Sequence, residues 1–113
     1  MHELSVTQSI LDIVFDHARR HESKKILKVR LVIGKMSGVV ADSIRFCFDA
    51  ITKETMAEGA ALEIEEVAYT GKCAVCARSF EILNYTLLCP DCGSTDIEIT
   101  GGLELYVKEF ETE

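Results

Sequence analysis

The sequence predicts an α+β fold in which two helices lie on one face of a small three-stranded sheet that carries an inserted zinc-ribbon-like module. Over the first 68 residues, stretches of helical hydrophobic period alternate with stretches of period two. Two Cys-x-x-Cys pairs follow, and a last alternating stretch comes after them. We therefore expect one domain built from residues 1–68 and 99–113, with residues 69–98 inserted as a second domain.

The first helix is expected over residues 5–21. Ser5, with Gln8 three residues later, resembles a capping box at its start. The apolar positions recur at helical spacing and form one stripe: Ile10, Leu11, Val14, Phe15 and Ala18. Residues 26–33 then alternate and predict a half-buried strand. In this strand one face is expected to carry Leu27, Val29, Leu31 and Ile33, and the other Lys28 and Arg30.

A second helix is expected over residues 42–56, after a glycine-containing loop. Its apolar face carries Cys47 together with Ile44, Phe48 and Ile51. Free cysteine is readily buried, so we expect Cys47 to be a core thiol. Residues 61–67 alternate again and predict a second strand, and residues 103–108 predict the last one. If these two strands pair with each other, the inserted module leaves and returns between neighbouring strands.

The inserted module is defined by four cysteines. Cys73-Ala74-Val75-Cys76 is separated by twelve residues from Cys89-Pro90-Asp91-Cys92. The spacing lets each pair wrap a tight turn around one ion, and four thiolates at tetrahedral corners form a closed zinc site of the structural type. The stretch from Phe80 to Leu88 between the pairs is expected to be a strand. The module has few apolar residues, so the metal must supply much of its folding free energy.

The four cysteines allow two other interpretations. Two disulfides would require an oxidising compartment, and nothing in the sequence indicates secretion. A rubredoxin-like iron site uses the same tetrahedral thiolate geometry, so the spacing does not separate iron from zinc. An iron electron carrier therefore stays open as an alternative function.

Composition and charge limit the cellular compartments and the kinds of partner that we expect. No window approaches the run of about 18 apolar residues that a membrane span needs, so we expect no membrane association. The N-terminus lacks the basic and then apolar pattern of a signal peptide, which predicts a cytoplasmic protein. The formal net charge is −7, which disfavours nucleic acid as a partner. The basic residues between His17 and Lys25 are explained by the favourable position of cations at a helix C-terminus.

A second candidate metal site lies at the very start of the chain. The α-amine of Met1, the backbone nitrogen of His2 and the imidazole of His2 can form fused chelate rings. The next backbone nitrogen or the Glu3 carboxylate could complete a plane of four ligands. Square-planar, nitrogen-rich coordination is typical of Ni²⁺ or Cu²⁺. His17 and His21 are four residues apart, but they lack a carboxylate to complete a site and are interpreted as solvated helix-end residues.

Together, motifs along essentially the full chain resemble those of the HypA/HybF family, the nickel-insertion accessory proteins of NiFe-hydrogenase maturation. The matching motifs are Met1-His2-Glu3, the segment 33–39 (Ile-Gly-Lys-Met-Ser-Gly-Val), Phe46-Cys47-Phe48-Asp49, Glu58-Gly59 and the four cysteines. The combination of an N-terminal Met-His-Glu with a late four-Cys cage is what makes the resemblance specific.

The resemblance implies a nickel metallochaperone rather than an enzyme. Ni²⁺ would be the cargo, bound through His2 with the Met1 amine and with Glu3 assisting, and Zn²⁺ would be structural at Cys73, Cys76, Cys89 and Cys92. Delivery would be to the hydrogenase large subunit with a HypB-like GTPase, and some members also serve urease. The chain has no phosphate-binding glycine motif, so nucleotide hydrolysis must belong to a partner.

One position departs from the family pattern. Some relatives carry a carboxylate in the turn after the Ser37 segment that supports the nickel site. Val40 stands at that position here, and the nearest acid is Asp42, so the resemblance leaves Asp42 without an assigned role. A zinc-ribbon module that binds proteins or nucleic acid is the other alternative function, although the basic face expected of a nucleic-acid binder is missing.

Overall fold

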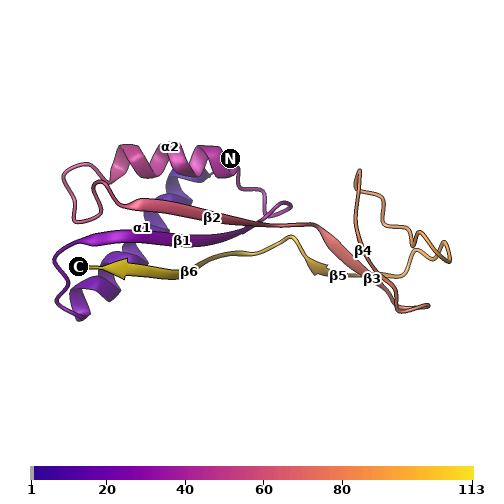
Figure 1. Cartoon of the computed structure of the whole chain (residues 1–113). Helices are drawn as coiled ribbons and strands as arrows, with labels where there is room; N and C mark the ends of the chain where they lie inside the picture. The colour runs from indigo at the N-terminus through magenta and orange to yellow at the C-terminus, as the bar shows by residue number, and fades with distance from the viewer. Residues whose placement is uncertain (1) are drawn as a thin grey trace.

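The computed structural model describes residues 2–113 and confirms the α+β architecture (Figure 1). The molecule is elongated, with extents of 55 × 26 × 17 Å. Along the chain the elements are α1 (Glu3–Arg20), β1 (Ile26–Gly34), α2 (Ala41–Ile51), β2 (Ala61–Val67), β3 (Thr70–Cys73), β4 (Ser79–Glu81), β5 (Ile97–Gly101) and β6 (Leu105–Thr112). Within the described part of the chain, no helix is long and apolar enough to cross a membrane.

The main sheet has β1 at its centre, in the order β2-β1-β6. β2 runs parallel to β1 because α2 carries the chain back across the sheet, and β6 runs antiparallel on the other side of β1. The last strand therefore does not pair with residues 61–67, and the condition for an insertion between neighbouring strands is not met. Once β2 occupies one edge of β1, the other edge of this apolar strand is the one left for β6. The inserted module consequently joins the two outer strands.

The start of β1 differs from the strict alternation predicted for it. Ile26 is fully buried, whereas Leu27 is 44% exposed. The pairing with β6 shifts register between Ile26 and Lys28, and this β-bulge moves Leu27 away from the core. From Val29 onward the predicted face is confirmed, because Val29, Leu31 and Ile33 are all buried.

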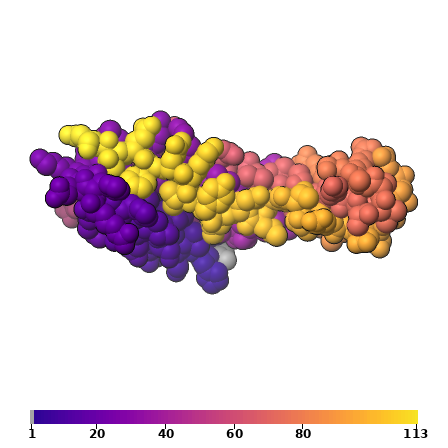
Figure 2. Space-filling model, turned by 90° about the horizontal axis from the view of Figure 1, so that it is seen from below, coloured from indigo at the N-terminus to yellow at the C-terminus, as the bar shows by residue number. Residues whose placement is uncertain are grey.

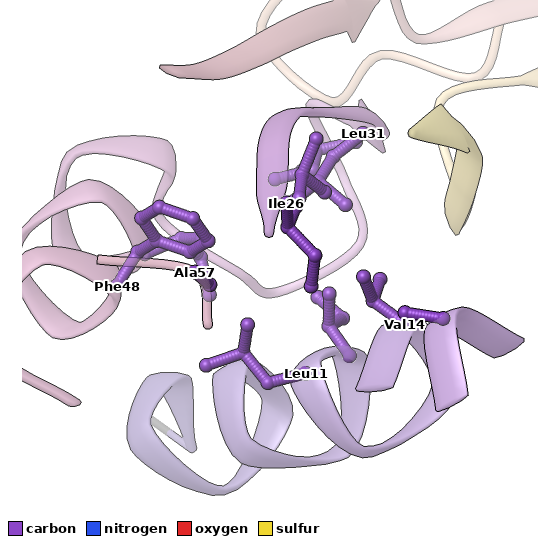
Figure 3. Packing of buried hydrophobic residues seen from close by; sticks show 11 residues of the cluster. Leu11, Val14, Ile26, Leu31, Phe48 and Ala57 are labelled. Carbon is purple, nitrogen blue, oxygen red and sulfur yellow. The ribbon is translucent and has the colours of Figure 1, made fainter. Parts of the chain in front are cut away.

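The core lies between that face of β1 and the two helices. Its cluster combines Ile10, Leu11, Val14 and Ala18 of α1 with Ile44 and Phe48 of α2 and with β1. Both helices therefore cover the same face of the sheet. Figure 3 shows Leu11 and Val14 pointing toward Ile26, with Phe48 and Ala57 to one side. Burying such side chains stabilises a fold by about 1.5–3 kcal/mol each.

The two helices begin and end differently from the predictions. α1 begins at Glu3, two residues early, with His2 as the N-cap and without a side-chain cap hydrogen bond. The predicted capping box at Ser5 is thus wrong, because Ser5 already lies within the helix. α2 ends at Ile51 rather than at residue 56. The chain leaves the helix through a series of turns in which Glu54 has a positive φ of 64°.

The inserted module has its own small sheet, in the order β4-β3-β5. The strand predicted from Phe80 to Leu88 is mostly absent, since β4 ends at Glu81. Asn84 and Tyr85 adopt positive φ angles of 53° and 59°, which turn the chain out of an extended path. Only Phe80 and Glu81 of the expected strand are therefore extended in β4.

Backbone N–H groups at the end of β1 and in the two residues after it hold both connections to the module. Gly34 N–H donates to Glu104 O at 2.7 Å, Lys35 N–H to Val67 O at 2.9 Å and Met36 N–H to Gly102 O at 2.7 Å. The backbones at Gly34 and Gly102 lie so close together that a Cβ on Gly34 would be 2.2 Å from the carbonyl carbon of Gly102. Gly102 itself has a φ of +111°. Glycine is required at Gly34 because backbone, not a movable side chain, occupies the space.

Gly34→Ala should destabilise the protein at the upper end of the roughly 1–3 kcal/mol range typical of overpacking. Gly38→Ala is the matched control, since nothing lies within 4 Å of its Cβ and only its φ of +85° is unfavourable. The control should lose about 1 kcal/mol. Urea unfolding of the zinc-loaded proteins measures both, and an equal or smaller loss for Gly34→Ala would contradict the proposed close contact.

Candidate metal centres

The four module cysteines converge on one point. Their Sγ atoms all lie within 4.8 Å of one another, with 3.6 Å between Cys73 and Cys92 and 3.5 Å between Cys76 and Cys89. A tetrahedral zinc ion with Zn–S bonds near 2.3 Å would separate its sulfurs by about 3.8 Å. A disulfide needs about 2.05 Å, and all five cysteines are free thiols. The arrangement fits one tetrahedral ion and does not support two disulfides.

Two similar turns supply the four thiols. In the first, Ala77 N–H donates to Cys73 O at 2.9 Å, and in the second, Gly93 N–H donates to Cys89 O at 3.0 Å. Ala77 and Gly93 both have positive φ, at 65° and 74°, and only Gly93 adopts it without steric cost. In each turn the first cysteine is a buried residue and the second an exposed one.

Backbone N–H groups inside the turns favour thiolate at the first cysteine of each pair. Cys76 N–H points at Cys73 Sγ at 3.5 Å, and Cys92 N–H at Cys89 Sγ at the same distance. The Cys76 N–H lowers the pKa of Cys73, and the Cys92 N–H lowers the pKa of Cys89 to about 6.

The second cysteine of each pair behaves in the opposite way. Backbone N–H from Ser94 favours thiolate at Cys92, but the neighbouring thiols, Cys73 foremost, and burial outweigh it and raise the pKa of Cys92 to about 12. The pKa of Cys76 is raised as well. Four thiolates cannot ionise together at this spacing without a cation among them, so the donor set is chemically suited to a divalent metal.

An ion pair joins the two turns on the outside of the cluster. Arg78 Nη1 lies 2.5 Å from Asp91 Oδ1, and this carboxylate is the main cause of the raised pKa of Arg78. Both side chains are about half exposed, so the pair adds little stability by itself. Its effect is to hold the second turn next to the first.

The N-terminal candidate site lies in the main domain, at the starts of α1 and α2. Met1 is outside the described residues, so the predicted amine ligand is not placed by the structure. His2 is exposed and caps α1. Glu3 is only 9% exposed, and Val40 N–H points at its Oε2 at 3.4 Å. Glu3 thereby ties the start of α1 to the start of α2.

A surface pocket of about 520 Å³ opens between these two helix starts. α1 contributes His2, Glu3, Leu4 and Ser5, and α2 contributes Asp42, Ser43, Phe46 and Cys47. Asp42 thus lies near His2 in space, although its carboxylate is paired with Arg45 at 2.9 Å and is 91% exposed.

Two residues of this pocket were not predicted to belong to a site. Cys47 was expected in the core, but it is half-buried and lines the pocket. Phe46 is 76% exposed there. Both follow Asp42 and Ser43 by about one helical turn, so they share their face of α2. The spacing of four residues from Asp42 and Ser43 is the sequence signal that could place them there. Cys47 also borders the apolar face of α2, and that position instead predicts a core residue.

The remaining histidines stay apart from both sites. His17 packs its ring at 6.4 Å from that of Phe110, and His21 caps the end of α1. Both are exposed at the helix C-terminus, as predicted. Among residues 2–113, the four cysteines are the only group of three or more metal-ligating side chains close enough to share an ion.

The fold and the thiolate cluster define a class of protein: a small α+β domain that carries an inserted four-cysteine metal module. Over residues 1–112 the chain matches the family model described as "Hydrogenase/urease nickel incorporation, metallochaperone, hypA". The chain belongs to this HypA family, as its sequence motifs indicated.

Individual relatives agree with this assignment. The chain is 44% identical to the hydrogenase maturation factors HypA of Geobacter metallireducens and Geobacter sulfurreducens, over the full length of each. It resembles the solution structure of the Ni metallochaperone HypA from Helicobacter pylori, with a TM-score of 0.68 and 26% identity over 99% of this chain and 97% of the other. A second solution structure of a HypA protein gives a TM-score of 0.72 at 28% identity, over 100% and 97%.

Cys73→Ala should abolish stoichiometric zinc binding and disorder residues 70–98, because structural zinc contributes on the order of 10 kcal/mol in small metal-folded peptides. Protection of the amides from hydrogen exchange should be lost there and retained in β1 and the helices, which have their own apolar core. Cys47→Ala is the matched control and should keep its zinc. Metal analysis with amide exchange checks both, and protection of residues 73–92 without zinc would refute a structural metal.

Proposed function

We propose that this protein is a nickel metallochaperone that binds Ni²⁺ at its N-terminus and delivers it to the large subunit of a NiFe hydrogenase. The single observation that carries the proposal is the separation of two chemically different donor sets. Thiolates are gathered in the inserted module, whereas His2 and Glu3 stand at a pocket formed by α1 and α2. Soft thiolates hold zinc, and nitrogen ligands in a plane select nickel by geometry.

The nickel ligands we propose are the His2 imidazole, the backbone nitrogen of His2 and the α-amine of Met1. His2 is exposed, so its imidazole can reach the amine side of the chain end without disturbing the core. A chain end is also the part of a fold that can rearrange at the lowest free-energy cost, which suits a carrier that must release its ion. Cargo release then needs no unfolding of the sheet.

Glu3 supports the proposed nickel site because its contacts fix the position of the first turn of α1. One oxygen of its carboxylate faces Val40 N–H, and the backbone oxygen of Glu3 accepts the Thr7 hydroxyl at 2.6 Å. These contacts orient the first turn of α1 against α2. We assign Glu3 an assisting role, either as an outer ligand or through this orientation of His2.

We further propose that the four cysteines hold Zn²⁺ and that the ion is structural. The cluster has four protein thiols and leaves no open position for a substrate, which is the arrangement of structural rather than catalytic zinc. The ion replaces the apolar core that the module lacks. In this view the module presents a fixed surface to partners and takes no part in chemistry.

Transfer of nickel requires other proteins in addition to this chain. We propose a HypB-like GTPase as the source of nucleotide-driven steps and the hydrogenase large subunit as the recipient, with urease maturation proteins as a further recipient class. All of these steps would take place in the cytoplasm. The chain itself would act as a carrier without enzymatic activity, and neither nucleic acid nor membrane would be a partner.

His2→Ala should lower Ni²⁺ affinity by more than about 100-fold, since the loss of a direct ligand exceeds the 10–100-fold effect typical of groups outside the coordination shell. His21→Ala is the matched control, as another exposed histidine at the other end of α1. Isothermal titration with nickel measures both, and zinc content should be unchanged in each. Unaltered affinity in His2→Ala would eliminate the N-terminal site.

An added residue before Met1 should also weaken nickel binding. The extension converts the α-amine into an amide and moves the free amine out of the chelate. The comparison is between the native start and a Gly-extended start, with circular dichroism in the d–d region of bound Ni²⁺ as a second measurement. Equal affinities and equal spectra would show that the amine is not a ligand.

A further inference from the structure

A small pocket opens where the end of α1 meets the loop that follows α2. It has a volume of about 240 Å³, its walls are mostly apolar, and it is lined by Phe15, Arg19, Thr55 and Met56. Beside it the chain segments are joined by a backbone hydrogen bond, in which Ile26 N–H donates to Met56 O at 2.8 Å. Pockets for small molecules usually measure about 300–1,000 Å³, so this one, which we call the Arg19 pocket, is sized for a single apolar side chain.

Arg19 forms one wall of this pocket, and its guanidinium group has no acidic partner among residues 2–113. The guanidinium carbon lies 5.7 Å from the centre of the ring of Phe15, which is one turn earlier in α1. Stacking on an aromatic ring holds the planar group in place and leaves its N–H donors free. Arg19 can therefore bind a carboxylate at the edge of the pocket through two parallel hydrogen bonds.

More unpaired cations lie on the segments that meet at the Arg19 pocket. Six of the twelve lysines and arginines form no ion pair within residues 2–113: Arg19, Lys24, Lys25, Lys35, Lys53 and Lys72. All of these except Lys35 and Lys72 belong to the end of α1, the turn after it or the loop after α2. The helix dipole explains cations in the last turn of α1, but it explains neither Lys53 nor the apolar pocket.

Acidic residues also occur on these segments, but none of them neutralises Arg19. Asp16 is paired with Arg20 at 3.0 Å, and the Glu58 carboxylate accepts the backbone N–H of Glu54 at 3.3 Å. The charge at the pocket itself is therefore positive, although the chain as a whole has a formal net charge of −7.

The Arg19 pocket is remote from both candidate metal sites. α1 and α2 begin at the pocket beside His2, and the Arg19 pocket lies at the other ends of the two helices. The inserted module is at the opposite end of the molecule (Figure 1). Figure 2 shows purple atoms of the end of α1 at the surface, far from the orange module. A partner docked here leaves His2 and the four cysteines accessible.

We propose that the Arg19 pocket docks an acidic segment of a partner protein. One apolar side chain of this segment fills the pocket, and a carboxylate about one helical turn away binds the guanidinium of Arg19. Lys24 and Lys53 add to the attraction of negative charge. The residue types favour a protein as the occupant, because Phe, Met and Arg are enriched in protein interfaces. Nucleic acid and anionic lipid would use the cations but leave the apolar pocket unfilled. This docking is separate from the proposed binding of nickel.

A synthetic acidic helix tests both parts of the contact. The probe is a peptide of about 15 residues, long enough to form a helix, with one leucine that has glutamates three and four residues away on either side. Titrated to about 1 mM into the ¹⁵N-labelled, zinc-loaded chain, it should shift the amide resonances of the pocket residues in a saturable way. Replacing its leucine by serine, or its glutamates by glutamine, should weaken binding at least about tenfold, through the loss of apolar burial or of charge-assisted hydrogen bonds.

Variants of the chain test the position of the site. Arg19→Glu should weaken binding of the peptide at least about tenfold, because it replaces attraction by repulsion at the pocket. Lys72→Glu is the matched control, since it makes the same change of charge at an unpaired, exposed lysine of the inserted module, and its affinity for the peptide should be unchanged. Nickel affinity should be the same in both variants and in the unaltered chain.

Several results would overturn this docking site. Shifts that do not saturate or that lie elsewhere on the chain would do so, and so would equal effects of Arg19→Glu and Lys72→Glu. Equal binding of the leucine and serine peptides would show that charge alone is responsible and that the pocket takes no part. Tighter binding of a short DNA duplex, or of vesicles that contain phosphatidylserine, at the same residues would assign the surface to a polyanion other than protein.

Discussion

Backbone hydrogen bonds at the end of β1 are the contact on which the arrangement of the molecule depends. Gly34, Lys35 and Met36 donate to carbonyls on both chain segments that lead to and from the inserted module. Their approach is closer than any side chain would allow at Gly34. The same loop continues to Val40, whose N–H points at Glu3. One short segment therefore sets the position of the module and of the start of α2, which borders the pocket between the two helices.

The two parts of the chain are stabilised by different physical means. The main domain has a contiguous apolar cluster from both helices and the central strand. In the module, by contrast, the fully or nearly fully buried side chains are mainly thiols and Ile82. The hydrophobic effect holds the first part, and metal coordination must hold the second. The proposed function uses this division, with thiol donors in the module and the nitrogen donors of the N-terminus in the main domain.

Ion pairs link the three strands on the face of the main sheet that the helices leave open. Glu63 lies 3.2 Å from Lys28 Nζ and 2.9 Å from Arg30 Nε, and Arg30 also reaches Glu109 on the opposite neighbour. The Lys28 contact is the largest cause of the lowered pKa of Glu63, and Glu63 is the main cause of the raised pKa of Arg30. These groups are substantially exposed, so they add little stability. They favour the observed strand order, since Arg30 lies between two acidic partners.

The sequence by itself determined the features that depend on local chemistry. Two Cys-x-x-Cys turns specify a four-thiol site because spacing within a turn fixes where the sulfurs lie, and Leu11, Val14 and Phe48 reveal their buried faces through periodicity. Tertiary structure alone decided the features that depend on distant residues. The partner of β6 was set by which edge of β1 remained free. The place of Cys47 beside His2 was set by the packing of α2 against α1, which brings together residues 45 positions apart. No local pattern encodes such contacts, because their free energy arises only when separate elements pack.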